Sequence, residues 1–328
     1  MNYPIGVVGG GAWGTALAAV MAKIHDNVLI WAREDDVVSG INDAHENKTY
    51  LPGSRLPPNI HATGKLFEMA NCGALLIVTP AQHVRSTLAA LPPSDVPLLL
   101  CAKGIEANTQ MLVSEIAAEV RPGNPLAVLS GPTFAHEVAS GKPTAITLAT
   151  ADQALGASLI RLIAAPRFRP YWSDDVVGAE IGGAVKNVLA IGCGVVDGAG
   201  LGLNARAALI ARGFAEMQRY GLARGGRAET LAGLSGLGDL VLTCSSENSR
   251  NFSLGRGLGQ GLAAAELMAD RKTVAEGAFT APVLLQSAKA LDVDMPIVAA
   301  ACALLDGTAT VAEVVQALLA RPLKAESW

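Results

Sequence analysis

The sequence contains few aromatic side chains and few charged ones. Aromatic residues make up 4% of the 328 residues and charged residues 16%, whereas hydrophobic residues make up 51%. Alanine, valine and leucine must therefore fill the core of a chain that is long enough for two domains. The formal net charge of −4 gives no electrostatic basis for a nucleic-acid partner or an acidic membrane surface. An anionic ligand would need basic residues gathered locally.

Cysteines and histidines are scarce, and their spacing is not that of metal ligands. We therefore expect no bound metal. An odd number of cysteines in apolar surroundings indicates reduced, buried thiols in a cytoplasmic protein. The five cysteines are Cys72, Cys101, Cys193, Cys244 and Cys302.

Long uninterrupted hydrophobic runs are also missing. Glycine, proline or a charged residue breaks every long apolar stretch, so we expect no membrane span. Residues 1–24 contain a glycine motif within an alternating pattern, and we expect no signal peptide there.

The first half of the chain alternates short apolar segments with helical patterns. This alternation predicts a doubly wound, mostly parallel sheet of the Rossmann type. A helix is expected at Trp13–Ile24, and the proline- and glycine-rich stretch Tyr50–Asn59 is expected to be a loop. The expected strands are Ile5–Val8, Asn27–Ala32, Ala74–Val78, Pro97–Ala102, Leu126–Leu129 and Thr144–Ala149.

The pattern changes near Tyr171. Ser173 and Asp174 are suited to cap a helix, and from Asp175 onward the chain is typical of helices joined by glycine-rich turns. We therefore predict a dinucleotide-binding α/β domain at 1–180 and an all-helical substrate and catalytic domain at 181–328. The glycine-rich stretches Gly192–Gly202 and Gly255–Gly261 indicate turns or close helix packing.

A glycine motif, Gly9-x-Gly11-x-x-Gly14, follows the first expected strand and opens the first expected helix. In that context Gly9 allows a tight turn, Gly11 lets the backbone approach a pyrophosphate, and Gly14 allows close helix–strand packing. The helix N-terminus adds N–H donors and a positive dipole end. The motif predicts a dinucleotide site.

The end of the second expected strand determines the choice of cofactor. An arginine at this place favours the 2′-phosphate of NADP, and an acidic residue favours the ribose hydroxyl of NAD. The chain has Arg33 followed by Glu34, so NADP and NAD both remain open.

A lysine, Lys186, interrupts the apolar stretch Glu180–Val196, which predicts a buried helix. Burying an ammonium without a partner is costly, so such a lysine either extends to the surface or has a function. A buried lysine beside a dinucleotide site suits a proton donor in the reduction of a small carbonyl compound. The adjacent Asn187, a second polar residue in the same stretch, favours the functional interpretation.

Ser249, Arg250 and Asn251 precede a glycine-rich segment and an expected helix start. The planar guanidinium of arginine suits a phosphate group, so this segment is a candidate phosphate site. A polar loop between helices would have the same composition, and the residues alone leave both interpretations open. Lys103 ends an expected strand at the edge of the sheet where doubly wound folds bind ligands.

Long blocks of the chain make it similar to the bacterial-type NAD(P)-dependent sn-glycerol-3-phosphate dehydrogenases. That family interconverts dihydroxyacetone phosphate and glycerol 3-phosphate with NAD(P)H, which supplies phospholipid synthesis. The blocks are GVVGGGAWGTALA from Gly6, YLPGSRLPPNI from Tyr50, CAKGIE from Cys101, SGPTFAHEVASGKPTA from Ser130, AVKNVLAIGCGVVDGAGLGLNARAALIARGFAEM from Ala184, LSGLGDLVLTCSSENSRNFSLGRGLGQG from Leu234 and VAEG from Val274.

The resemblance implies roles for individual residues. Lys186 would be the catalytic acid and base, with Lys103 and Asp239 as companions. The implied substrate contacts are Lys103, Gly131, Thr133, Lys186, Asp239, Ser249, Arg250 and Asn251. The implied cofactor contacts are Gly9, Gly11, Ala12, Trp13, Gly14, Arg33, Lys103, Ala135, Arg250, Val274 and Glu276.

One departure concerns the pyrophosphate turn. Many members carry a serine before an aromatic residue where this chain has Ala12 and Trp13. The substitution removes a hydroxyl and keeps the backbone donors, so it bears on cofactor affinity and leaves the reaction unchanged.

Two other functions remain as alternatives: another two-domain, lysine-dependent hydroxyacid or 6-phosphogluconate-type dehydrogenase, and a non-catalytic nucleotide-binding protein. The expected partner is a small phosphorylated substrate. The sequence does not determine oligomeric state, and a homodimer is left open.

Overall fold

The computed structural model describes residues 3–269 and 275–323, and the chain divides into two compact units. The first unit comprises Met1–Lys103 and Leu112–Val176, and the second comprises Gly104–Met111 and Val177–Trp328. The boundary predicted at about residue 180 lies inside a long helix, α7 (Val176–Gly198).

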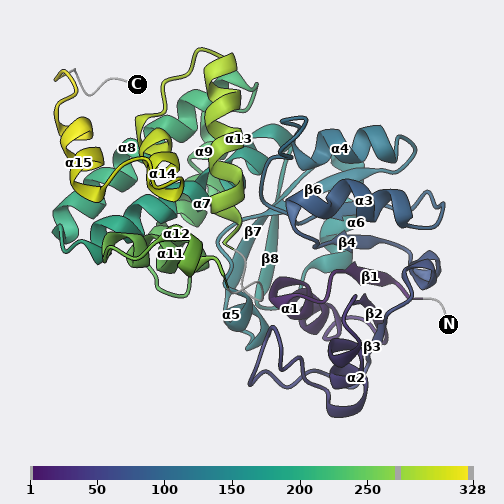
Figure 1. Ribbon diagram of the computed structural model, residues 1–328. Coiled ribbons are helices and arrows are strands. Elements are labelled where there is room, and N and C mark those ends of the chain that lie inside the picture. Colours follow the sequence, from purple (N-terminus) through teal and green to yellow (C-terminus); the bar gives the residue numbers. More distant parts are fainter. Residues whose placement is uncertain (1–2, 270–274, 324–328) are drawn as a thin grey trace. The chain divides into compact units, whose positions relative to one another are not determined.

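An eight-stranded sheet of order β3-β2-β1-β4-β5-β6-β7-β8 forms the centre of the first unit (Figure 1). β1 pairs in parallel with β2 on one side and with β4 on the other, so the strand order reverses there. Ligands bind at this switch point in doubly wound folds. The strands are β1 (Ile5–Val8), β2 (Val28–Trp31), β3 (Ile60–Thr63), β4 (Leu75–Ile77), β5 (Leu98–Leu100), β6 (Leu126–Ser130), β7 (Thr144–Ala149) and β8 (Phe168–Ser173).

The predicted mostly parallel sheet is confirmed. Among the pairings of these eight strands, only that of β6 with β7 is antiparallel, and it places Ser130 opposite Thr147. The central strands are buried on both faces, which explains their nearly continuous apolar sequences.

Two strands were missed from the sequence. β3 is a four-residue segment, IHAT, and its centre is only half-buried. β8 has the sequence FRPYWS and contains both a proline and side chains exposed to solvent. It lies at the sheet edge, where a proline is tolerated, and so its sequence lacks the pattern of a buried strand.

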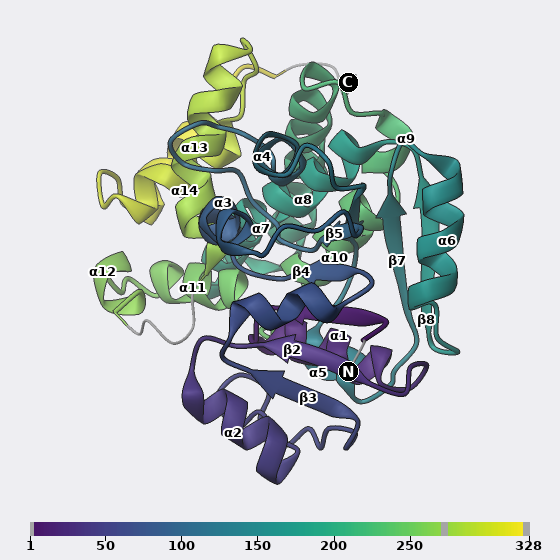
Figure 2. The ribbon, with the colours of Figure 1, turned by 90° about the vertical axis from the view of Figure 1, so that its right-hand side faces the viewer.

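Six α-helices accompany the described strands of this unit. α1 and α5 pack against each other, and α6 packs against β7 and β8 (Figure 2). The predicted helix at Trp13–Ile24 ends earlier, at Met21, because the amide of Lys23 donates to Val20 in a tighter turn. The helices are α1 (Ala12–Met21), α2 (Asp35–Ala44), α3 (Val84–Ala90), α4 (Val113–Val120), α5 (Ala135–Ala139) and α6 (Gln153–Ile163).

The second unit is helical, as predicted. The sequence expectation of a cap before its first helix fits the geometry, because the amide of Asp175 donates to Ser173 Oγ at 3.2 Å. After α7 come α8 (Gly202–Ala223), α9 (Ala228–Leu231), the π-helical turn η3 (Leu234–Gly238), α10 (Asp239–Cys244), α11 (Arg250–Gly259), α12 (Ala264–Leu267), α13 (Glu276–Ala290), α14 (Pro296–Leu305) and α15 (Val311–Leu319).

α7 is the core helix of this unit. It is long and apolar enough to cross a membrane by length and composition, but 89% of its apolar window is buried inside the protein. Glycines let α11 approach it closely. A Cβ at Gly194 would lie 2.0 Å from the carbonyl oxygen of Phe252, and one at Gly255 would lie 1.9 Å from that of Ile191. These reciprocal contacts confirm that both glycine-rich stretches take part in close helix packing.

Candidate active site

The glycine motif forms a tight turn between β1 and α1. A Cβ at Gly14 would lie 1.9 Å from the carbonyl oxygen of Gly9, so the first turn of α1 presses on the end of β1. Gly9 adopts a φ of +130°, a conformation that favours glycine. A Cβ at Gly11 would meet no atom within 4 Å, so this backbone faces open space. The turn has the shape that a pyrophosphate requires.

The N-terminus of α1 is suited to bind an anion. Gly11 is its N-cap, and no side chain caps it among the described residues. The amides of Ala12 and Trp13 belong to the first turn, where α-helices leave backbone donors unpaired. Asn47, which is buried, fixes the turn by donating from Nδ2 to the carbonyl of Gly10 at 2.8 Å. Nothing in the sequence around Asn47 indicated this contact.

Four buried polar atoms in the first unit have no hydrogen-bond partner within the described chain: Trp13 Nε1, His45 Nδ1, Thr79 Oγ1 and Ser130 Oγ. Thr79 follows β4, and Ser130 ends β6, so both lie where parallel strands of the sheet end. Buried polar atoms are rarely left unpaired in folded proteins, and a bound ligand is one explanation for such atoms. The positions of Trp13, Thr79 and Ser130 fit a dinucleotide bound along this edge. The sequence prediction included Trp13 but missed Thr79 and Ser130.

Arg33 and Glu34 follow β2, as predicted. The Arg33 side chain is 81% exposed, and its guanidinium donates to Glu34 Oε1 at 3.2 Å. An exposed ion pair of this kind is weak, so a ligand phosphate can compete for the arginine. The geometry is therefore compatible with either NADP or NAD as the cofactor.

Lys103, Gly131 and Thr133 lie together. Lys103 Nζ donates to the carbonyl of Gly131 at 3.0 Å, and Thr133 Oγ1 donates to the same carbonyl at 3.2 Å. Gly131 has a φ of +157°, and a Cβ there would lie 3.1 Å from the Cα of Ile146. Ala135 begins α5 just beyond this loop. The structure thus gathers four of the predicted substrate and cofactor residues after β5 and β6.

Lys186 lies in a buried polar cluster in the second unit. Its side chain is 9% exposed, and Nζ donates to Asp239 Oδ1 and to Thr243 Oγ1, each at 2.8 Å. Thr243 Oγ1 in turn donates to the backbone carbonyl of Asp239 at 2.6 Å. Lys186 does not extend to the surface, and the structure brings it into contact with Asp239. Thr243, four residues beyond Asp239 on α10, was missed.

Close backbone packing places this cluster. A Cβ at Gly182 would lie 2.4 Å from the carbonyl oxygen of Ser235, so α7 touches the turn η3 at this point. Gly182 and Lys186 are four residues apart and share a face of α7. Asp239 begins α10 directly after η3. The glycine contact thereby brings the Asp239 carboxylate to the Lys186 ammonium.

The next residue along α7, Asn187, belongs to a second polar network. Its Oδ1 accepts from Asn251 Nδ2 at 3.0 Å, and Asn251 Oδ1 accepts from the amide of Gly277 at 2.9 Å. This network links α7, α11 and the first turn of α13, which Glu276 begins. Asn251 therefore holds three helices together. Val274, another predicted cofactor residue, lies outside the described residues.

Ser249 and Arg250 form the start of α11. Ser249 is the N-cap and accepts from the amide of Phe252 at 3.2 Å, whereas the Arg250 side chain is exposed in the first turn. The guanidinium and the positive end of the helix dipole both attract an anion. The start of α11 is therefore a candidate phosphate site.

The predicted buried thiols are confirmed: all five cysteines are buried and free. Burial raises the pKa of the Cys244 thiol well above its usual value, and the neighbouring Cys193 thiol raises it further. Burial likewise raises the pKa of Cys72 to about 12. The Cys72 and Cys244 thiols therefore stay protonated at neutral pH and serve as small core side chains.

Comparisons with known proteins agree with the geometry. Residues 4–156 match the family described as the NAD-dependent glycerol-3-phosphate dehydrogenase N-terminus, and residues 175–316 match the corresponding C-terminus. The chain is 60% identical over 321 residues to an NAD(P)+ glycerol-3-phosphate dehydrogenase of Sphingopyxis alaskensis, with 98% of this chain and 97% of that protein covered. It is 61% identical over 326 residues to one of Erythrobacter litoralis, with 99% and 98% covered.

Solved structures are similar as well. The crystal structure of a glycerol-3-phosphate dehydrogenase from Coxiella burnetii has a TM-score of 0.93 and 36% identity, and covers 98% of this chain and 99% of that chain. Both family matches, the near-complete coverage of the relatives and this structural similarity agree. The chain belongs to the family of NAD-dependent glycerol-3-phosphate dehydrogenases.

Proposed function

We propose that the chain interconverts dihydroxyacetone phosphate and sn-glycerol 3-phosphate, with hydride exchanged with NAD(P)H. The observation that carries this proposal is the buried contact of 2.8 Å between Lys186 Nζ and Asp239 Oδ1 in a member of this family. A buried ammonium held by a carboxylate can provide the proton that carbonyl reduction requires.

The residues of the first unit fit the nicotinamide cofactor. The Gly9–Gly14 turn and the amides of Ala12 and Trp13 would hold the pyrophosphate, and Arg33 would lie near the adenosine ribose. The unpaired polar atoms of Thr79 and Ser130 are additional contacts for this ligand. When bound, the cofactor supplies or accepts the hydride. The cofactor is NADP or NAD.

Lys186 supplies the proton. Hydride addition to the ketone leaves negative charge on its oxygen, and an ammonium at that oxygen both stabilises the charge and transfers a proton to it. Asp239 and Thr243 fix the orientation of the ammonium through the two hydrogen bonds at 2.8 Å. In the direction of oxidation, the neutral amine would accept the proton from the substrate hydroxyl.

The start of α11 binds the substrate phosphate. Arg250 provides a planar cationic group, and the first-turn amides of α11 provide further donors. The buried Asn251, fixed to Asn187 and Gly277, holds this helix end in place. Lys103, Gly131 and Thr133 are proposed as further substrate contacts, and Glu276 as a cofactor contact. We also propose that the enzyme acts in the cytoplasm and supplies phospholipid synthesis.

An assay of cofactor oxidation against a set of substrates tests the proposal. We expect NADH or NADPH oxidation with dihydroxyacetone phosphate, little with dihydroxyacetone, and no reduction of cofactor with 3-hydroxyacids or 6-phosphogluconate. Activity on the hydroxyacids would favour the other lysine-dependent dehydrogenases. Cofactor binding without turnover of any of these compounds would favour a non-catalytic nucleotide-binding protein. Light scattering of the purified chain tests whether it forms a homodimer.

A further inference from the structure

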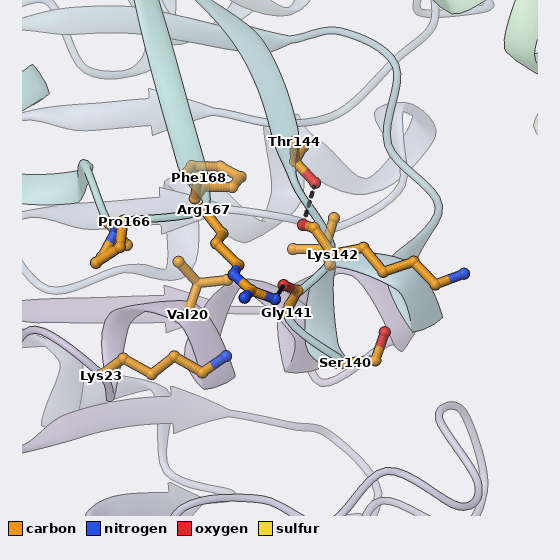
Figure 3. A pocket seen from close by; sticks show the side chains of 11 residues that line it. Val20, Lys23, Ser140, Gly141, Lys142, Thr144, Pro166, Arg167 and Phe168 are labelled. Carbon is orange, nitrogen blue, oxygen red and sulfur yellow. Dashed lines mark hydrogen bonds between the residues drawn. The ribbon is translucent and has the colours of Figure 1, made fainter.

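A cavity of about 340 Å³ lies in the first unit, at the end of α1 remote from the glycine motif (Figure 3). α1 has ten residues, so its two ends are roughly 15 Å apart. The walls come from the C-terminal end of α1, the segment after α5, and the residues that begin β7 and β8. The cavity is therefore separate from the pyrophosphate turn, and none of its lining residues belongs to the Lys186 cluster.

The end of α5 shapes the opening. The amide of Lys142 donates to the carbonyl of Glu137 and that of Gly141 to the carbonyl of Val138, which is the Schellman arrangement with glycine in the left-handed region. A Cβ at Gly141 would lie 3.2 Å from Lys23 Nζ. Glycine at this position therefore leaves room beside the ammonium of Lys23.

The rim of the cavity is basic. Lys23, Lys142 and Arg167 line it, and Lys142 pairs with Glu137 at 2.9 Å. Neither Lys23 nor Arg167 has a carboxylate partner in the parts of the chain that the structure describes. Arg167 donates from one guanidinium nitrogen to the carbonyl of Gly141 at 3.3 Å, and further N–H donors of its guanidinium remain. Figure 3 shows the Lys23 ammonium and the Arg167 guanidinium directed toward the same space by Gly141.

The floor of the cavity is apolar. Val20, Val138 and Phe168 line it and are each at most 4% exposed. The half-buried Ala165 and the exposed Pro166 also line the cavity, and a free inorganic ion would leave their apolar surface uncovered.

The hydroxyls of Ser140 and Thr144 already donate to backbone carbonyls, so toward a ligand they can act only as acceptors. The positive charge that binds an anionic ligand must therefore come from the basic rim.

We propose that this cavity is a binding site for a small organic anion with a carboxylate or phosphate head and an apolar body. Lys23 and Arg167 hold the head, and Ala165, Pro166 and the apolar floor contact the body. The volume lies at the lower end of the range for small-molecule sites. This site is independent of the proposed reaction and requires no residue of the active site.

Titration calorimetry with hexanoate and hexyl phosphate tests the proposal on the full chain, with 1-hexanol and inorganic phosphate as reference ligands. We expect both amphipathic anions to bind more tightly than either reference ligand, with affinity that falls as salt concentration rises. The difference between hexanoate and hexyl phosphate identifies the preferred head. Equal affinities for 1-hexanol and hexanoate would overturn the proposal, as would equal affinities for inorganic phosphate and hexyl phosphate.

Variants locate the binding. Arg167→Gln and Lys23→Gln should each weaken the binding of hexanoate and hexyl phosphate about tenfold, because each removes one of the cations that hold the head. Arg169→Gln is the matched control: it removes an exposed arginine from β8 that does not line the cavity, and binding should be unchanged. All three side chains are exposed, so melting temperatures should match the parent. Parent-like binding of the anions in both Arg167→Gln and Lys23→Gln would contradict the proposal. The two cations would then only offset the partial negative charge at the C-terminal ends of α1 and α5.

Discussion

Lys186 Nζ lies 2.8 Å from Asp239 Oδ1, and both side chains are buried. This contact changes the expectation for Lys186. The sequence alone shows an amine at a buried position, so its removal could raise stability. With the partner in place, removing the amine takes the paired cation away from the buried carboxylate of Asp239, and breaking such a buried ion pair typically costs about 3–5 kcal/mol.

Lys186→Met should reduce turnover by about a hundredfold or more, because the proton donor is lost. It should also lower the melting temperature, for the reason just given. Lys289→Met, at an exposed lysine on α13, is the control and should change neither quantity. Cofactor affinity should survive, since the glycine motif belongs to the other unit.

The double variant Lys186→Met, Asp239→Asn separates catalysis from folding. It removes both charges together, so it should recover most of the stability that Lys186→Met loses while turnover stays low. Parent-like turnover in this folded double variant would rule out the catalytic role of Lys186.

Arg250→Ala should lower kcat/KM for dihydroxyacetone phosphate by roughly thirtyfold, which corresponds to about 2 kcal/mol for a charged hydrogen bond. The slow reaction with dihydroxyacetone should be unaffected, because that ketone has no phosphate. Arg256→Ala, on the same helix, removes an arginine that pairs with Asp197 and serves as control. If both ketones lost activity equally, the phosphate role of Arg250 would be wrong.

Arg33→Asp should weaken the binding of NADPH about tenfold relative to that of NADH, because a carboxylate repels the 2′-phosphate and accepts a hydrogen bond from a ribose hydroxyl. Glu34→Gln should have the opposite effect, since it frees the guanidinium from its pair at 3.2 Å. Fluorescence titrations with both cofactors measure the ratio. An unchanged ratio in both variants would make Arg33 a surface residue without a role in cofactor choice.

Much of the fold was predictable because buried parallel strands are apolar throughout. Ile5–Val8 and Leu98–Leu100 are buried at every position and stand out in the sequence. β8 does not, since solvent covers one side of an edge strand and Pro170 interrupts it. The antiparallel direction of β7 depends on how the chain crosses the sheet after α5, and no local pattern encodes that.

The candidate site likewise contains some residues that the sequence reveals and others that it does not. Lys186 was detectable as a charge in an apolar helix, and the glycines of the motif as a spacing. Thr243 and Asn47 were not detectable, because each is polar in an ordinary surrounding sequence and acquires its contact only when distant segments pack. Asp239 was selected by family resemblance alone, whereas Asn251 also belonged to the candidate phosphate segment, and the structure shows the contacts that each side chain makes.

Glu216 provides a prediction about pH. This side chain of α8 is 1% exposed, and its two carboxyl oxygens accept from the amides of Ile297 and Val298 at the start of α14, at 2.7 and 3.2 Å. Burial raises the pKa of Glu216 to about 7 from 4.5, although the two backbone amides oppose the shift. The folded state therefore holds a proton that the unfolded state releases between these pH values.

The sign of the pH dependence follows from that difference. The stabilisation from the bound proton is fully present below about pH 4.5 and is lost as the pH rises to about 7. The loss can reach about 3 kcal/mol of the free energy of unfolding. Glu216→Gln cannot titrate, so subtracting its urea-unfolding profile from that of the parent isolates this contribution from the other carboxylates. Glu119→Gln, at an exposed carboxylate that pairs with Arg85, should leave the parent profile unchanged in this window. A difference profile between parent and Glu216→Gln that is flat from pH 4.5 to 7 would show that Glu216 stays ionised when buried, with the amides of α14 outweighing its desolvation.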